Sequence, residues 1–170
     1  VISGTAEANS TVNVLLDGGS IGTTTASGGG AWSYDYTGTT LSDGSYVLTA
    51  TATDTVGNTS VASSDFIITI DSGTPAAPAV TGITNDTGTG GDGITSDNTL
   101  VISGTAEANA TVDVLIDGGS IGTITANGAG AWSYDHTGTT LSDGSYAITA
   151  TAADIAGNSS AASNAFNITI

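Results

Sequence analysis

Hydrophobic and polar residues alternate along much of the chain with a period of two, which is the pattern of a β-strand with one buried face. The clearest run places Tyr146, Ile148, Ala150 and Ala152 on one side and the intervening threonines on the other. Short runs of this kind are separated by turns rich in Gly, Asn and Asp, at the regular spacing of a β-sandwich. The chain is therefore predicted to be all-β.

About seven strands are expected in the second half of the chain. They are Ala79–Thr84, Thr99–Thr105, Thr111–Ile116, Ser120–Ala126, Ala131–Thr137, Ser145–Asp154 and Ala161–Ile170. The turns between them include Asp117-Gly118-Gly119 and Asp143-Gly144. Asp and Gly supply the positive φ that tight hairpins need, so these turns support the layout.

The chain contains one unit written twice. Val1–Ile70 recurs as Val101–Ile170 without a gap, and 53 of the 70 positions are identical. We expect a first repeat at 1–70 that lacks its opening strand and loop, a linker at 71–78, and a complete repeat at 79–170. The linker holds both prolines of the chain, which favour an extended and stiff connection, so the repeats are expected to form an end-to-end rod.

Two aromatic motifs recur in both repeats. Trp32 and Trp132 follow Gly-rich turns and are expected to anchor the core. The alternative is that these rings lie on a solvent face and stack against sugars. Leu41–Tyr46 and Leu141–Tyr146 have the form of a tyrosine corner at the entry to a strand, which is a structural motif.

The charge of the chain is one-sided. It has sixteen Asp and Glu residues, no Lys or Arg, and a formal net charge of −16. Such a chain repels phosphate backbones and anionic lipid, which argues against nucleic-acid binding and adsorption to a membrane. No apolar run approaches the roughly 18 residues of a spanning helix, so membrane insertion is not expected. Cysteine is absent, which excludes disulfides.

The missing counter-charge predicts bound cations, and hard carboxylate oxygens favour several Ca²⁺ ions over softer metals. Reversal of direction at each strand places the acids in loops at two poles of a sandwich. One pole is expected to gather Glu107 and Asp154 with the linker residue Asp71, as a calcium site at the junction. The far pole is expected to gather Asp86, Asp92, Asp97, Asp117 and Asp143. None of these loops has the ligand order of an EF-hand or a β-roll.

Other kinds of site find little support. His136 is the single histidine and Tyr36 occupies the matching position in the first repeat, so no general base or catalytic triad is expected and the protein is not predicted to be an enzyme. Rows of outward threonines suggest ice binding, but one sandwich strand aligns only a few of them. A carbohydrate- or ice-binding adhesive module is the alternative function.

The ordered motifs resemble the bacterial Ig-like repeats that occur in tandem in giant RTX adhesins secreted by the type I route. They are Ile-Ser-Gly-Thr-Ala-Glu-Ala-Asn (2–9, 102–109), Thr-Val-x-Val, Asp-Gly-Gly, Gly-Ala-Trp-Ser-Tyr, Leu-Ser-Asp-Gly-Ser-Tyr, Ala-Asp-x-x-Gly-Asn (153–158) and Ile-Asp at 70–71. The repeats are also similar to the extender region of ice-binding adhesins of Antarctic marine bacteria. The resemblance implies tandem Ig-like Greek-key sandwiches.

The resemblance further implies a structural extender that calcium makes rigid and that projects a ligand-binding tip from the cell. Its partners are the neighbouring repeats of the same chain, and other domains of the parent protein bind the surface ligand. The implied location is the surface of a Gram-negative, marine bacterium. The implied metal ligands are Glu107, Asp154, Asn158, Asp71, Asp86, Asp92 and Asp97 in the second repeat and linker, and Glu7, Asp54 and Asn58 in the first. The turn acids Asp17 and Asp43, which match Asp117 and Asp143, complete the candidate set.

Overall fold

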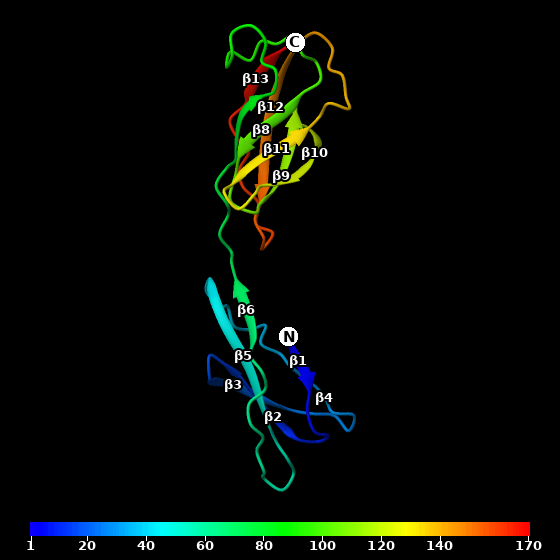
Figure 1. The fold of residues 1–170 in the computed structure, drawn as a ribbon. Coiled ribbons are helices and arrows are strands. Elements are labelled where there is room, and N and C mark those ends of the chain that lie inside the picture. Colours follow the sequence, from blue (N-terminus) through cyan, green and yellow to red (C-terminus); the bar gives the residue numbers. More distant parts are fainter. The chain divides into compact units, whose positions relative to one another are not determined.

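The computed structural model describes residues 1–170 and contains thirteen β-strands and no helix (Figure 1). The chain divides into two compact units, unit 1 at Val1–Asp71 and unit 2 at Ser72–Ile170. All strand pairs within the sheets are antiparallel, and the all-β prediction is confirmed. Because helices are absent, the structure offers no long apolar helix that could cross a membrane.

Unit 2 is a sandwich of two sheets. Its strands are β7 (Ala79–Ile83), β8 (Val101–Thr105), β9 (Thr111–Ile116), β10 (Gly119–Thr125), β11 (Ala131–Asp135), β12 (Ser145–Ala153) and β13 (Phe166–Thr169). One sheet has the order β10-β9-β12-β13 and the other has the order β11-β8-β7. The predicted number of seven strands is correct.

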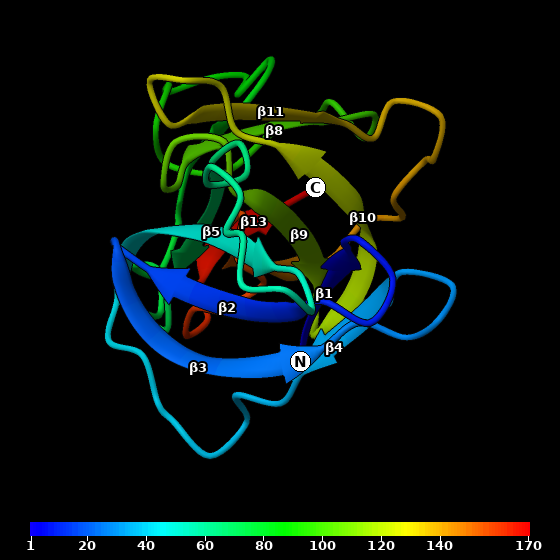
Figure 2. The ribbon, with the colours of Figure 1, turned by 90° about the horizontal axis from the view of Figure 1, so that it is seen from below.

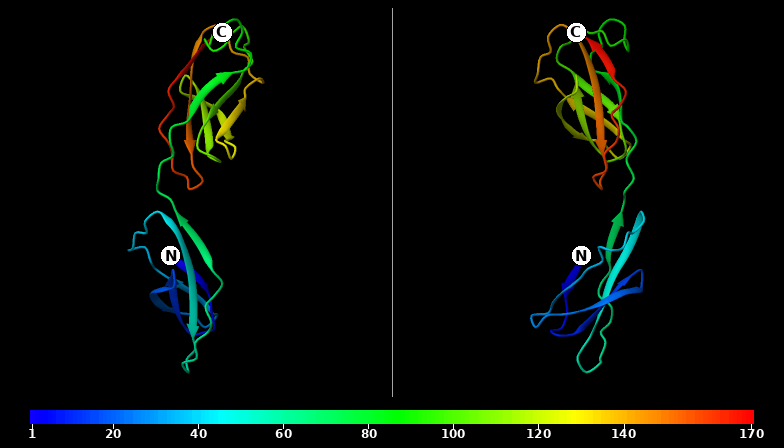
Figure 3. Two further views of the ribbon diagram at one scale, coloured as in Figure 1. Left: turned by 60° about the vertical axis from the view of Figure 1, so that its left-hand side comes forward. Right: turned by 180° about the vertical axis from the view of Figure 1, so that it is seen from behind.

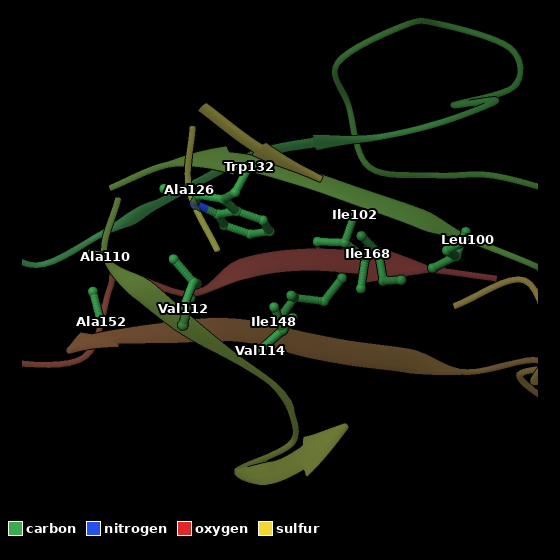
Figure 4. Close-up of a cluster of buried hydrophobic side chains, with 11 residues drawn as sticks. Leu100, Ile102, Ala110, Val112, Val114, Ala126, Trp132, Ile148, Ala152 and Ile168 are labelled. Carbon is green, nitrogen blue, oxygen red and sulfur yellow. The ribbon is translucent and has the colours of Figure 1, made fainter. Parts of the chain in front are cut away.

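The inward faces of both sheets supply the core of unit 2 (Figure 4). Most of its buried side chains come from β8, β9, β11, β12 and β13 and include Ile102, Val112, Val114, Trp132, Ile148 and Ile168. In β12 the residues Ile148, Ala150 and Ala152 are buried and the threonines between them are half-buried, as the alternation predicts.

Unit 1 repeats this architecture with one strand fewer. Its strands are β1 (Ile2–Thr5), β2 (Thr11–Leu16), β3 (Gly19–Thr25), β4 (Ala31–Tyr34), β5 (Gly44–Thr53) and β6 (Phe66–Ile70). One sheet has the order β3-β2-β5-β6, of which β3, β2 and β5 lie side by side in Figure 2, and the other is the pair β1-β4. No strand of unit 1 takes the place that β7 has beside β8.

The core of unit 1 is correspondingly smaller. Only Val12, Val14, Ala26 and Leu48 are buried hydrophobic residues there. The half-buried side chains Ile2 and Ile68 occupy positions whose counterparts in unit 2, Ile102 and Ile168, are 0% and 1% exposed. The shared strands have the same pattern in both units. The units differ in burial because no strand equivalent to β7 covers Ile2 and Ile68.

One predicted strand is wrong in its first half. The expected Ala161–Ile170 strand begins at Phe166, because serine side chains hold the segment before it. Ser160 Oγ accepts a hydrogen bond from Ala152 N–H at 2.9 Å and Ser163 Oγ accepts one from Ala150 N–H at 3.0 Å. The backbone N–H groups of the two serines donate in return to the carbonyls of the same alanines, so each serine makes two bonds to β12. The predicted strand Thr111–Ile116 is correct, and the other five differ from the observed strands by one or two residues at their ends.

The aromatic motifs have the predicted structural roles in unit 2. The Tyr146 hydroxyl donates to Ser142 O at 2.9 Å, and Tyr46 makes the same bond to Ser42 O in unit 1, so the tyrosine corner is confirmed. Trp132 is 4% exposed within the core, whereas Trp32 is half-buried. A ring as buried as that of Trp132 is not available to stack on a sugar.

Candidate metal centre

The long loop between β7 and β8 holds the half-buried carboxylate of Asp86. Asp86 Oδ2 accepts a hydrogen bond from Gly91 N–H at 2.6 Å, while Asp86 Oδ1 is buried and has no hydrogen-bond partner in the protein. Leaving a buried polar atom unpaired costs about 1–3 kcal/mol, and more when it belongs to a charged group. A carboxylate oxygen in this position fits a hard cation such as Ca²⁺, which satisfies an oxygen that no N–H reaches.

The rest of the loop is held by its own side chains and by β13. Asp97 Oδ1 accepts hydrogen bonds from Thr99 N–H and Thr99 Oγ1, and Asp97 Oδ2 accepts one from Asn85 Nδ2 at 2.8 Å. The Thr99 backbone bond, followed by the Asn85 amide and the Thr99 hydroxyl, lowers the pKa of Asp97 below its ordinary value. The loop also forms backbone hydrogen bonds with Thr169 at the end of β13: the Thr95 N–H donates to Thr169 O, and the Thr169 N–H donates to Gly93 O. These bonds hold the loop beside the C-terminal residues of unit 2 (Figure 3).

Asp92 lies on the exposed side of the same loop. Its Oδ1 accepts the N–H of Ile94 at 2.9 Å, which is the local turn bond that Asp commonly makes. Of the three loop acids expected at the far pole, Asp86 is thus the one with an unused buried oxygen, and Asp92 and Asp97 are engaged in bonds that shape the loop.

In the turn after β12, Asp154 accepts hydrogen bonds from Asn158. Asp154 Oδ1 accepts the N–H of Asn158 at 2.9 Å, and Asp154 Oδ2 accepts the Asn158 side-chain amide at 2.9 Å. Unit 1 repeats both bonds between Asp54 and Asn58. The asparagine side chain, in each case the largest cause, lowers the pKa of both aspartates. These pairs were expected as metal ligands, and in the structure each aspartate closes the turn.

The hairpin acids Asp117 and Asp17 have a clear structural role. Asp117 lies in the left-handed region with φ 49°, and its Oδ1 accepts Ala147 N–H at 2.8 Å across the sheet. Asp17, with φ 50°, does the same for Val47. Asp is one of the few residues with a side chain that tolerates this backbone conformation, so the sequence choice serves the turn.

The remaining candidates are exposed and lie in separate loops. They are Glu7 after β1, Glu107 after β8, Asp43 and Asp143 before β5 and β12, and Asp71 at the end of unit 1. The structure brings no three of its His, Cys, Asp and Glu side chains into one group with the spacing of a metal site. An ion at Asp86 would therefore take most of its oxygens from carbonyls, hydroxyls and water, which calcium accepts as ligands.

His136 has the structural role that the repeat implies. Its ring centroid lies 6.3 Å from that of Tyr134 with an interplanar angle of 31°, and Tyr36 and Tyr34 form the same tilted pair at 6.2 Å and 32°. Since a tyrosine replaces the histidine without changing the contact, the position calls for an aromatic ring and not for a general base.

Sequence reasoning pointed to the loops but missed two features. It did not single out the unpaired oxygen of Asp86, which depends on how the glycines of the loop fold back. It also did not anticipate the serine bonds to β12, although the recurrence of two serines three residues apart in both repeats was a visible signal.

Three solved structures of bacterial proteins are similar to this chain. A Ca²⁺-stabilized adhesin with which an Antarctic bacterium reaches out and binds ice matches 98% of this chain at 29% identity, with a TM-score of 0.44. A 1.5-MDa bacterial ice-binding adhesin matches 98% at 26% identity and a TM-score of 0.37. The fibronectin(III)-like modules of Clostridium thermocellum CbhA match 100% at 18% identity and a TM-score of 0.49.

This chain spans 42%, 55% and 81% of those three structures, respectively. No curated protein matches the sequence. The sequence profile of bacterial Ig-like domains matches residues 1–72 and again residues 74–170, so it covers each unit in turn. The family expected from the motifs is confirmed, and the chain belongs to the bacterial Ig-like domains.

Proposed function

We propose that the chain is a pair of extender repeats from an adhesin on a bacterial surface, and that calcium stabilises and stiffens it. Two near-identical units of one Ig-like family, joined directly in one chain, support a repeated structural element. Stiffness of such an array depends on each unit and each connection. The neighbouring repeats are accordingly its first partners, and the parent's other domains hold the surface ligand.

The single observation that best supports calcium is the buried, unpaired Oδ1 of Asp86 in a chain without any Lys or Arg. The chain cannot neutralise its sixteen acids with its own basic side chains, and a divalent cation reduces their mutual repulsion by two charges per ion. Asp86 would hold one ion through that oxygen. The sequence adds candidate ligands at Asp71, Glu107 and Asp154 for the connection between repeats.

Secretion by the type I route and a marine source belong to the same proposal and come from the sequence motifs alone. Calcium is scarce in the cytoplasm and abundant outside the cell, so a calcium-dependent extender would become rigid after export. The alternative of sugar stacking is disfavoured for Trp132, which is 4% exposed.

Calorimetry tests the calcium part of the proposal. An ion present at 100 times its Kd stabilises the folded state by about 2.7 kcal/mol. At about 4–8 °C per kcal/mol for a small domain, EDTA should lower the Tm of the affected unit by more than about 10 °C. Small-angle scattering should record a narrower range of conformations with calcium than with EDTA. An identical Tm in calcium and in EDTA would refute the calcium proposal.

Two charge-matched variants locate the site. Asp86→Asn should weaken calcium binding in isothermal titration by at least about tenfold, which corresponds to about 1.4 kcal/mol. Asp65→Asn removes the same charge from an exposed position outside the candidate set and should leave the affinity unchanged. Asp71→Ala reports separately on the connection. If Asp65→Asn weakened binding as much as Asp86→Asn, general charge screening would explain the effect and a defined site would not.

A further inference from the structure

The turn between β10 and β11 contains Asn127-Gly128, and no other asparagine of the chain is followed by glycine. Both residues are exposed. An asparagine side chain can react with the backbone nitrogen of the next residue, because the five-membered ring that forms carries little strain. Glycine hinders this reaction least, since it has no Cβ beside its nitrogen. The turn therefore joins the two groups of an intramolecular reaction that needs no enzyme.

Two backbone N–H groups hold the side-chain carbonyl of Asn127. Its Oδ1 accepts hydrogen bonds from Ala129 N–H at 2.9 Å and from Ala131 N–H at 3.1 Å. Attack on the amide carbon Cγ places negative charge on Oδ1, and donors aimed at that oxygen stabilise the charge. The two N–H groups therefore fix the orientation of the amide and make its carbon more electrophilic.

The Gly128 nitrogen is free to react. Its N–H donates no hydrogen bond, whereas Gly130 N–H in the same turn donates to Asn127 O at 2.8 Å. A Cβ added at Gly128 would meet no atom within 4 Å, and the φ of this residue lies outside the left-handed region. Gly130 differs, because its φ is 81° and an added Cβ would lie 2.4 Å from Ala106 O. The fold thus requires glycine at 130 but not at 128.

We propose that Asn127 is a site of spontaneous covalent modification, at which its side-chain amide becomes an acid. The Gly128 nitrogen loses its proton to a base in the solvent and forms a bond to Asn127 Cγ, and Nδ2 leaves as ammonia, which gives a succinimide. One water molecule then opens the ring. Cleavage between Cγ and the Gly128 nitrogen gives aspartate, and cleavage between the main-chain carbonyl carbon and that nitrogen gives isoaspartate. The net change consumes one water molecule and releases one ammonia.

The two products affect the turn differently. Aspartate keeps a carboxylate oxygen in the place of Oδ1, so both N–H groups retain an acceptor, which is now charged. Isoaspartate adds one carbon to the main chain and displaces that oxygen. The bonds from Asn127 N–H to Ala131 O at 2.9 Å and from Gly130 N–H to Asn127 O close around a main chain of normal length. Because the turn joins β10 and β11 of two different sheets, isoaspartate should weaken the connection between the sheets of unit 2.

Unit 1 supplies a natural comparison. Ser27 occupies the position of Asn127, and its hydroxyl accepts Ala31 N–H at 3.2 Å. Ser27 N–H donates to Ala31 O and Gly30 N–H donates to Ser27 O, both at 2.8 Å, as in unit 2. The same turn therefore forms without an amide. With time, unit 2 gains a negative charge at this turn and unit 1 does not. This inference is independent of calcium and of the proposed adhesin function.

Prolonged incubation of the full chain at mildly alkaline pH tests the proposal. Mass spectrometry of proteolytic peptides locates each amide that becomes an acid, and enzymatic methylation identifies isoaspartate. Asn109 is the internal reference, because it is also exposed but is followed by alanine. We expect Asn127 to react at least about tenfold faster than Asn109 in the folded chain, which corresponds to about 1.4 kcal/mol of activation free energy. Isoaspartate should appear at 127, which direct hydrolysis of the amide does not produce.

Three variants separate the parts of the mechanism. Gly128→Ala places a methyl group beside the attacking nitrogen and should slow the reaction by at least about tenfold, without lowering the Tm of unit 2. Asn127→Ser introduces the residue of unit 1 and should abolish the reaction while the turn remains folded. Asn127→Asp is the reference for the aspartate product. The aged chain that contains isoaspartate should have a lower Tm of unit 2 than this variant.

A synthetic peptide of residues 124–131 reports on the same sequence without the folded turn. If the peptide formed isoaspartate while the folded chain did not, the turn would protect Asn127 and the proposal would be overturned. Equal rates at Asn127 and Asn109 in the folded chain would overturn it as well. An unchanged rate in Gly128→Ala would do the same, since ring closure through the Gly128 nitrogen would then not be the route.

Discussion

Equivalent core isoleucines in the two units offer a direct measure of what β7 contributes to stability. Ile168 is 1% exposed within the unit 2 core, and its counterpart Ile68 in unit 1 is half-buried. We expect Ile168→Ala to destabilise unit 2 substantially more than Ile68→Ala destabilises unit 1.

The magnitude follows from burial. Replacing Ile with Ala removes three carbons, which at about 0.8 kcal/mol each amount to about 2.4 kcal/mol of transfer free energy. A closed cavity at Ile168 adds to this, so we expect about 3–4 kcal/mol there. At Ile68 part of the side chain is already in water, so its truncation leaves no closed cavity and most of the cavity contribution is absent. The expected loss is about 1–1.5 kcal/mol.

Each unit has its own tryptophan, so the two transitions can be followed separately. Trp132→Phe leaves Trp32 to report on unit 1, and Trp32→Phe leaves Trp132 to report on unit 2. Urea unfolding by fluorescence then gives the free energy of unfolding of each unit, with and without the isoleucine change. Each comparison is made within one tryptophan background.

Valine truncation supplies the control. Val12 and Val112 are 1% and 0% exposed, so Val12→Ala and Val112→Ala should cost the same to within about 0.5 kcal/mol. If Ile68→Ala cost as much as Ile168→Ala while the valine pair agreed, Ile68 would be as deeply buried in solution as Ile168. The reasoning from burial would then be refuted.

Three further results are expected. Asp117→Ala should lower the free energy of unfolding of unit 2 in urea by about 1–2 kcal/mol, because alanine loses the bond to Ala147 N–H and tolerates φ 49° poorly, whereas Asp117→Asn should lose less than half of that. Hydrogen bonds from the Thr137 hydroxyl and from its N–H hold the pKa of Asp135 below its ordinary value. NMR titration should find this pKa lowered, and Thr137→Val should raise it. An unchanged pKa in the variant would show that the Thr137 hydroxyl is not the cause. The stability linked to this depressed pKa is complete above the ordinary pKa, about 3.8, and is lost as pH falls through the folded-state value. EDTA should lower the urea midpoint more strongly than the same ionic strength of NaCl does, and equal effects would point to screening alone.

Local regularities of the sequence predicted much of the fold. Alternation at 146–152 predicted the buried face of β12, and the repeated Leu-Ser-Asp-Gly-Ser-Tyr predicted the hydroxyl bond of Tyr146 to Ser142. Both depend on residues close in the chain. The half-burial of Trp32 was not predictable from its motif, which is the same as that of Trp132, because exposure depends on whether another strand covers the ring.

The candidate site divides in the same way. The strand pattern predicted that the acids lie in loops, but it did not predict which groups each carboxylate bonds to. Asp117 and Asp154 bond to nearby backbone or asparagine groups, whereas Asp86 keeps a buried oxygen unpaired. These outcomes depend on atomic positions within each loop, and Asp, Asn and Gly at a turn are compatible with all of them.

The serine bonds to β12 have a consequence for assembly of repeats this alike. A plain backbone ladder accepts a strand in several alignments, and 53 identical positions of 70 would let a segment pair with the wrong place or the wrong copy during folding. In the observed register the Ser160 and Ser163 hydroxyls each accept a backbone N–H of β12, so a shift by one residue would lose both side-chain bonds at once. The serine pair, present in both units, therefore favours one register for this segment in two sequences that are nearly the same.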